Sequence, residues 1–464
     1  MLNIWKFLQF IGPGIMVSVA YMDPGNYSTS VAGGAQFKYE LLFSIFVSNL
    51  FAIVLQCLCV KLGTVTGLDL AENCRRHLPR KLNYALFGFA EFAIIATDLA
   101  EVVGTAIALE ILFGIPLTFG VLLTVLDVLF ILIFYRPEKH SMKQVRMFET
   151  FVSVFVGATL VCFVLELSKL TIVSKWELFR GFMPSKVVFK EQQAMYISLG
   201  ILGATVMPHS LYLGSSLVKP RLHDYDIKKY GKVRSTGPSL AAVKYTLNVS
   251  YVELIISLFF IATFVNSAIL IVAGATLYGE ADAGDADLLT IYQLLCKNIT
   301  PAAGLIFALA MLFSGQSAGV ICTMSGQIVS SGFLNWTIDP WKTRLCTRML
   351  AIVPCLLATI FMGSKGIASM LNFSQVVLSL LLPIVSAPLL YFTANRKIMT
   401  VSDFSNSLYI ESDEHTSLVV NKETEKDYTN SSWLTATAVG IWIIISSLNS
   451  YLVFSFLMGA DVHF

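Results

Sequence analysis

Two long apolar stretches of this chain are each broken near the middle by a proline and polar residues. The first stretch covers about residues 10–37 and the second about residues 193–218. Proline removes a backbone donor and disfavours the helical conformation in the residue before it, and an unpaired carboxylate at mid-bilayer depth is costly. Interruptions that recur in the two halves of a chain are the best sequence indication of a transporter's binding site. The two interruptions read Asp23-Pro24-Gly25-Asn26 and Met207-Pro208-His209.

The composition indicates an all-α polytopic membrane protein. The chain is 56% hydrophobic and 13% charged, with a mean hydropathy of +0.72, whereas soluble domains carry about 25% charged residues. Apolar runs long enough to cross a bilayer recur from end to end. No basic face with interleaved aromatic residues indicates a nucleic-acid partner. The cysteines lie mostly within or beside apolar segments and predict neither a disulfide framework nor a metal cluster.

The hydropathy pattern predicts eleven spans in a single transmembrane domain, residues 1–464. The broken spans are the first and the sixth, so residues 10–168 and 193–394 form two five-helix halves. Because five is odd, the second half is inverted relative to the first, as in inverted-repeat transporters. Residues 433–459 add an eleventh helix, and the polar segment 399–432 is expected to be a flexible cytoplasmic loop. The predicted spans are 10–37, 41–63, 83–113, 117–135, 147–168, 193–218, 248–276, 301–333, 346–364, 367–394 and 433–459.

The basic residues orient the chain, because cytoplasmic loops carry an excess of lysine and arginine. With the N-terminus in the cytoplasm, 23 of the 32 basic residues fall on the inner side and 8 on the outer side, and Arg348 lies inside a span. The acidic segment 280–287 is also on the outer side. We therefore expect a cytoplasmic N-terminus and a C-terminus on the opposite side.

The chemistry of the two breaks favours a transition-metal ion. The helix that ends before Asp23 directs unpaired carbonyls and the negative end of its dipole at the break. Asp23 adds a full charge and Asn26 a neutral oxygen. The thioether of Met207 is a soft ligand that suits Mn²⁺, Fe²⁺ or similar ions better than Mg²⁺ or Ca²⁺. The alternatives are that Asp23 only caps a kinked helix and that Met207 only fills a gap in the core.

A second set of ionisable residues lies in the third, sixth and ninth spans. Asp98 and Glu101 are three positions apart and share a helix face, where two carboxylates repel each other without a cation nearby. His209 titrates near physiological pH, and Arg348 supplies a fixed positive charge. Together they are typical of a proton relay, although a salt-bridge network that only holds helices together would use the same residues.

The tenth span offers two further polar residues on one face, Asn372 and Gln375. Such residues complete the coordination of a metal ion or hydrogen-bond membrane helices to one another. The spacing alone is compatible with both roles.

The motifs resemble those of a known family. Asp23-Pro24-Gly25-Asn26 and Met207-Pro208-His209 are similar to the two signature motifs of the NRAMP family of divalent metal transporters. The stretch Ala96–Gly104 resembles the family's third-helix motif, and Gly315–Leu334 resembles the transport signature around its eighth helix. Four motifs occur in the right order, and the resemblance covers about residues 5–460.

The resemblance implies a LeuT-like fold and the transport of Mn²⁺ and Fe²⁺ together with protons toward the cytoplasm by alternating access. Metal ions and protons are then the substrates, and the lipid bilayer surrounds the protein. We expect no enzyme activity, no cofactor and no required protein partner. The motifs imply metal binding by the side chains of Asp23, Asn26 and Met207, by the backbone carbonyls of Ala20 and Ala204, and in some conformations by Gln375. They imply a proton route through Asp98, Glu101, His209 and Arg348.

The chain departs from the family pattern at Gly214. Many members carry a second histidine there, five residues after the first, so any role of that histidine in proton coupling is absent here. The run Met207–Gly214 and the short termini resemble fungal members of intracellular membranes. This likeness implies a vacuolar or endosomal location in preference to the plasma membrane.

Other functions share parts of this pattern. A related transporter of Mg²⁺ or of an organic substrate would have the same broken helices, but Met207 argues against Mg²⁺ and Asp23 against an anionic substrate. An intramembrane protease would need His-Glu-x-x-His or Gly-x-Gly-Asp within a span, and neither is present. A metal sensor that does not transport would be built from the same site.

Overall fold

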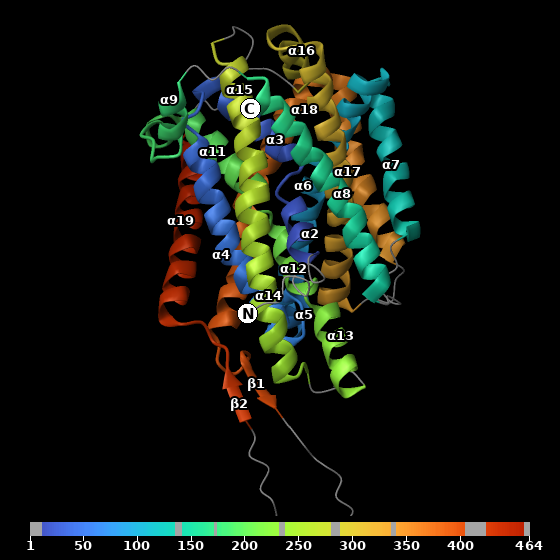
Figure 1. Cartoon of the computed structure of the whole chain (residues 1–464), viewed down its shortest axis with the longest axis vertical. Helices are drawn as coiled ribbons and strands as arrows, with labels where there is room; N and C mark the ends of the chain where they lie inside the picture. Colours follow the sequence, from blue (N-terminus) through green and yellow to red (C-terminus); the bar gives the residue numbers. More distant parts are fainter. Residues whose placement is uncertain are drawn as a thin grey trace, which may run out of the picture.

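The computed structural model describes residues 12–134, 142–170, 174–231, 237–279, 288–335, 340–403 and 424–458. Nearly all of them lie in helices that pack side by side (Figure 1). The first broken span consists of α2 (Pro13–Val19) and α3 (Pro24–Phe37), and the second consists of α11 (Gln192–Thr205) and α12 (Pro208–Ser216). The other long elements are α4 (Leu42–Thr66), α6 (Arg80–Phe113), α7 (Leu117–Phe134), α8 (Met142–Ser168), α14 (Leu240–Ile256), the π-helical segment η2 (Ser257–Ala262), α15 (Thr263–Thr276), α17 (Pro301–Leu334), α18 (Pro340–Ala394) and α19 (Ser432–Leu457).

The short elements gather at two opposite ends of the bundle. At one end, which we call the outer end, lie α9 (Lys175–Gly181) and α16 (Leu288–Asn298), with α10 (Val187–Lys190) following α9 (Figure 1). At the other, the inner end, lie α5 (Leu70–His77), α13 (Lys219–Tyr230) and a hairpin of β1 (Thr400–Asp403) and β2 (Thr424–Asp427). Each end thus collects the loops that the charge pattern assigns to one side of the membrane.

The centre of the bundle and its periphery differ in burial. In their most apolar stretches, α6 and the run from α11 to α13 have 89% of their residues buried, against 28% in α8 and α19. α6 packs along α17 and α18, and α3 packs on α15. On the outside, Trp433, Phe361 and Leu457 are all at least 79% exposed. Large exposed apolar side chains of this kind fit a lipid surface.

The described residues contain eight helices that are long and apolar enough to cross a membrane, fewer than the eleven predicted spans. α2 and α3 are each too short on their own because the break divides their span. Residues 345–361 form a shorter apolar helical stretch. The side chains of α7 are described only in part.

The spans predicted at 346–364 and 367–394 both fall within α18 (Pro340–Ala394). Residues 345–361 form one apolar helical stretch, and residues 370–394 form a helix long and apolar enough to cross a membrane. Residues 362–369, where the two predicted spans meet, lie outside the described side chains. The division into two spans therefore stays a prediction.

The segment 399–432, predicted to be flexible, has regular structure at both of its ends. β1 and β2 pair in antiparallel fashion with Val401 opposite Lys426. Lys61 of α4 donates a hydrogen bond to Asn430 (2.7 Å), which ties the end of the segment to the bundle. The prediction was wrong for these residues, because strands of four residues that pair across a long separation leave little periodicity in the sequence. Residues 404–423 lie outside the described residues.

The inner end of α2 is held by charged side chains of other helices. Oε1 of Glu253 on α14 accepts hydrogen bonds from the backbone N–H groups of Gly12 (2.5 Å) and Gly14 (3.0 Å). Arg221 of α13 forms two 2.9 Å hydrogen bonds with the carboxylate of Glu149 on α8, and a Cβ at Gly12 would collide with that carboxylate. Because α2 has only seven residues, it is too short to be stable alone and depends on these contacts.

Candidate metal site

Asp23 lies directly before α3 in an extended conformation, with φ −82° and ψ 168°. Its Oδ1 accepts hydrogen bonds from the backbone N–H of Asn26 (3.0 Å) and from the Asn26 side-chain amide (2.7 Å). Pro24 fills the first helical position, where no N–H is needed. Asp23 is 0% exposed, and its Oδ2 has no hydrogen-bond partner among the described residues. One oxygen therefore caps the helix, and the other remains an acceptor in the interior.

The second break has the same local design. Met207 is extended and fully buried, and it lies directly before α12, whose first residue is Pro208. The side-chain amide of Asn26 donates a 3.0 Å hydrogen bond to the carbonyl of Ala204, near the end of α11. This bond joins the two breaks. The carbonyl ends of α2 and α11 thereby face a common region, and the negative ends of two helix dipoles favour a cation there.

Gln375 of α18 lies between the two breaks. A Cβ at Gly25 would collide with its side-chain amide, and a Cβ at Gly203 would collide with its backbone carbonyl. Gln375 is fully buried, its Nε2 donates to Ser374 (3.1 Å), and its Oε1 has no hydrogen-bond partner in the described part of the chain. Its position is close to both motifs, as a metal ligand from the tenth predicted span requires. Asn372 instead accepts a 2.7 Å hydrogen bond from Ser28.

The unwound carbonyls of the first break are partly bonded by side chains that the sequence analysis did not single out. Asn266 of α15 donates to the carbonyl of Tyr21 (3.0 Å), and the hydroxyl of Ser314 on α17 donates to the carbonyl of Met22. No described side chain donates to the carbonyl of Ala20. The signal for Asn266 was available, since an amide within an apolar run is uncommon without a hydrogen-bond partner.

Asp98, Glu101 and Arg348 form one buried cluster between α6 and α18. Nη1 of Arg348 is 3.1 Å from Oδ1 of Asp98 and 3.1 Å from Oε2 of Glu101. The three residues are at most 3% exposed. The thiol of Cys322 on α17 also belongs to this cluster, since its sulfur and one oxygen of each carboxylate lie within 4.8 Å of one another. The sequence did not indicate Cys322, because its proximity depends on how α17 packs on α6.

His209 connects the second break to this cluster. It lies in the first turn of α12, and its Nδ1 is 3.3 Å from the hydroxyl of Thr97, the neighbour of Asp98 on α6. The histidine is 1% exposed. The structure therefore joins Asp98 and Glu101 through Arg348 and places His209, the fourth residue of the predicted proton route, against the neighbour of Asp98 on α6.

The space beside Gly214 is occupied by a glutamine. A Cβ at Gly214 would collide with Oε1 of Gln56 on α4. The amide nitrogen of Gln56 donates hydrogen bonds to the hydroxyls of Tyr21 (2.9 Å) and Ser210 (2.8 Å). A hydrogen-bonded side chain of α4 thus lies where a side chain of residue 214 would project.

The family described as natural resistance-associated macrophage protein-like, or Nramp, matches residues 14–411. The iron transporter SMF3 of Saccharomyces cerevisiae is 70% identical over 465 residues, which cover 99% of this chain and 98% of the relative. The manganese transporter SMF2 of the same yeast is 52% identical, over 99% of this chain and 90% of the relative.

Solved structures agree with this relationship. A manganese transporter of Eremococcus coleocola, determined with an aromatic bis-isothiourea compound, superposes with a TM-score of 0.79 at 31% identity, over 99% of this chain and 90% of that chain. MhsT in complex with L-phenylalanine superposes with a TM-score of 0.54 at 12% identity, over 95% of this chain and 98% of that chain, a likeness of fold alone. The predicted LeuT-like fold is therefore confirmed, and the chain belongs to the Nramp family of membrane transporters.

Proposed function

We propose that this protein is a secondary active transporter that moves Mn²⁺ and Fe²⁺ together with protons toward the cytoplasm by alternating access. The observation that carries the proposal is the fully buried carboxylate of Asp23, whose Oδ2 has no hydrogen-bond partner among the described residues. This oxygen lies at the junction of two unwound helices, where dipoles also favour a cation. The names of the relatives, which are iron and manganese transporters, support the same ions.

The metal ion would be bound by a mixed set of donors. Asp23, Asn26 and Gln375 offer side-chain oxygens, Ala20 and Ala204 offer backbone carbonyls, and Met207 offers sulfur. Asn26 already touches both Asp23 and Ala204, so a small rotation of its amide exchanges those bonds for a bond to the metal. Oxygen with one soft sulfur suits Mn²⁺ and Fe²⁺ better than Mg²⁺ or Ca²⁺.

Protons would take a separate route through the cluster on α6. His209 adjoins the metal site in sequence and reaches Thr97, while Asp98 and Glu101 share Arg348. An arginine cannot release its proton in a protein, so the exchangeable protons belong to the histidine and the two carboxyls. With Gly214 in place of a second histidine, α12 carries one imidazole, that of His209.

Metal flux in proteoliposomes under an imposed pH gradient tests the proposal. With the outside acidic, we expect Mn²⁺ uptake to be accompanied by acidification of the lumen, and Fe²⁺ under reducing conditions to compete with Mn²⁺. Liposomes without protein provide the baseline. The absence of both Mn²⁺ and Fe²⁺ movement would refute the proposal, and metal movement without lumenal acidification would refute its proton-coupled part.

We further place the inner end of the bundle in the cytoplasm and the protein in a vacuolar or endosomal membrane. The support for the orientation is the excess of basic residues in the loops that gather at the inner end. An epitope in the 404–423 segment should be accessible to antibody on intact isolated vacuoles or endosomes, and an epitope reached only after these membranes are permeabilised would refute the orientation. Fluorescence microscopy of a tagged chain locates the membrane, and a signal confined to the cell surface would refute the intracellular location.

A further inference from the structure

A buried glutamate near the outer end of α8 lacks a partner that would account for its burial. Glu166 is 0% exposed, and neither Oε1 nor Oε2 has a hydrogen-bond partner among the described residues. Glu166 also forms none of the ion pairs between described residues. Burying a carboxylate without compensation is costly, and an ionisable residue within a membrane span is a functional candidate for that reason.

Glu166 lies on the outer side of the candidate metal site. Cys162 and Phe163 precede it by four and three positions, so the three side chains share a face of α8. The ring of Phe163 is 5.5 Å from that of Tyr27, in the first turn of α3, so this face of α8 packs against the helix that begins at the first break. α3 runs from the break toward the outer end, where Lys38, directly after it, pairs with α9.

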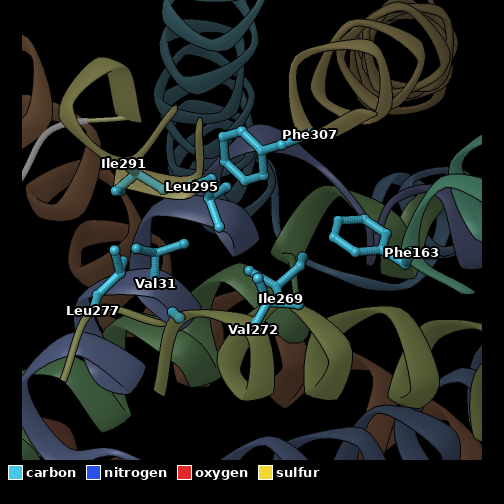
Figure 2. A pocket seen from close by; sticks show the side chains of 9 residues that line it. Val31, Phe163, Ile269, Val272, Leu277, Ile291, Leu295 and Phe307 are labelled. Atoms are coloured by element: carbon cyan, nitrogen blue, oxygen red, sulfur yellow. The ribbon is translucent and has the colours of Figure 1, made fainter. Parts of the chain in front are cut away.

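A cavity beside Phe163 offers no ligand of its own to an ion. Its lining comes from α3, α8, α15, α16 and α17 and is apolar throughout (Figure 2). Since α16 lies at the outer end, the cavity lies between that end and the ring of Tyr27, which contacts Phe163 and Phe307. Glu166 is not among the lining residues and lies three positions after Phe163 on the same face of α8.

We propose that Glu166 forms a second binding site for divalent transition-metal ions, on the outer side of the site at the breaks. The inference rests on the proposed function, because it assigns a further site to the same substrates. The carboxylate is the main ligand. The thiol of Cys162, four positions before it on the same face of α8, is the sulfur donor, and the buried hydroxyl of Tyr27, whose ring packs on Phe163, is a further oxygen donor. A set of oxygens with one sulfur accepts Mn²⁺ and Fe²⁺ more readily than Mg²⁺. The site holds an ion before it reaches Asp23.

Mn²⁺ binding to the purified full chain tests the proposal directly, with free Mn²⁺ measured by its EPR signal. Asp23→Ala should lose the site at the breaks but retain a weaker Mn²⁺ site, and Asp23→Ala combined with Glu166→Gln should lose both. If Asp23→Ala alone abolishes all Mn²⁺ binding, the second site does not exist. If Asp23→Ala binds and transports Mn²⁺ like the wild type, the proposed role of Asp23 in transport is refuted. In that case, loss of Mn²⁺ binding in Glu166→Gln would still support the second site.

Uptake kinetics provide an independent readout. Glu166→Gln preserves the shape of the side chain and removes its charge. The KM for Mn²⁺ uptake should rise about tenfold, and the maximal rate of uptake should be nearly unchanged. Tyr27→Phe, which keeps the ring contacts, should raise KM less. Two controls should leave KM unchanged: Glu191→Gln, which removes an exposed carboxylate before α11, and Thr159→Val, which removes a buried hydroxyl from α8. An unchanged KM in Glu166→Gln, or an equal rise in the controls, overturns the assignment.

Discussion

Two acidic sites are buried in the centre of this bundle, and they differ in what neutralises them. Asp98 and Glu101 share the guanidinium of Arg348, with both distances at 3.1 Å. Asp23 receives only the neutral groups of Asn26, and one of its oxygens has no hydrogen bond from a described residue. A buried ion pair contains its own counter-charge, whereas a carboxylate without one is neutralised by a proton or by a mobile cation. Burial of an acid is thus not enough to identify a metal site, and the presence or absence of a fixed cation separates the two cases.

The largest effect should follow from changing the carboxylate that has no fixed cation. Asp23→Asn keeps an oxygen that can cap α3 but removes the charge, so Mn²⁺ uptake should fall by more than about 100-fold, beyond the usual loss for a residue that only supports a ligand. Uptake of ⁵⁴Mn into proteoliposomes measures this loss, and a thermal unfolding curve checks that the variant is folded. Uptake close to that of the wild type would remove the distinction between the two acidic sites.

Removing the fixed cation should affect stability more than metal binding. Arg348→Met removes the positive charge that Asp98 and Glu101 share in the interior, and the free energy of unfolding should fall by about 3–5 kcal/mol. Thermal unfolding in detergent measures the change. The matched variant adds Asp98→Asn and Glu101→Gln to Arg348→Met and should recover most of the lost stability. If Arg348→Met unfolds at the wild-type temperature, the cluster is neutralised in another way.

Asp98→Asn separates a proton relay from a salt-bridge network. In a relay, the proton influx that accompanies each Mn²⁺ ion should fall about tenfold or more, since a positioned acid–base group contributes at least that much to proton transfer, while Mn²⁺ affinity changes little. A pH-sensitive dye inside the liposomes and a Mn²⁺ binding curve give the two numbers. An equal loss of metal binding and of proton flow would favour the purely structural role.

The smallest effect should be on the selectivity for Mn²⁺ over Ca²⁺. Met207→Ala removes the sulfur at the second break, and Ca²⁺ should then compete with Mn²⁺ several-fold more effectively, because Ca²⁺ gains from all-oxygen sites and not from thioethers. Competition of Ca²⁺ with ⁵⁴Mn uptake measures this effect. Met195→Ala, in the same run of helices but away from the break, is the control. If Ca²⁺ competition is the same in both variants, Met207 serves packing alone.

Local chemistry made the breaks predictable from the sequence. A proline favours an extended conformation in the residue before it and can itself begin a helix. The structure has such helix boundaries at Asp23-Pro24 and at Met207-Pro208. The order of four motifs likewise made the family predictable. These features depend on residues that are neighbours in the chain.

The features that could not be predicted depend on contacts between distant residues. Gln56 occupies the space beside Gly214 from another helix, and Asn266 and Ser314 reach carbonyls of the first break from α15 and α17. Only the packing of the whole bundle brings such residues together. The proximity of Cys322 to Asp98 has the same origin.

The hydrogen bonds from Gly12 and Gly14 to Glu253 connect residues 241 and 239 positions apart. They have a consequence for biosynthesis. α2 cannot form these bonds until the seventh predicted span has been made, and residue 253 lies past the midpoint of the 464 residues. Until then α2, with its seven residues, must remain unfolded or be held by other factors. Truncated chains that end before residue 253 should therefore have an N-terminus that proteases cleave readily, even where the later helices of the first half are protected.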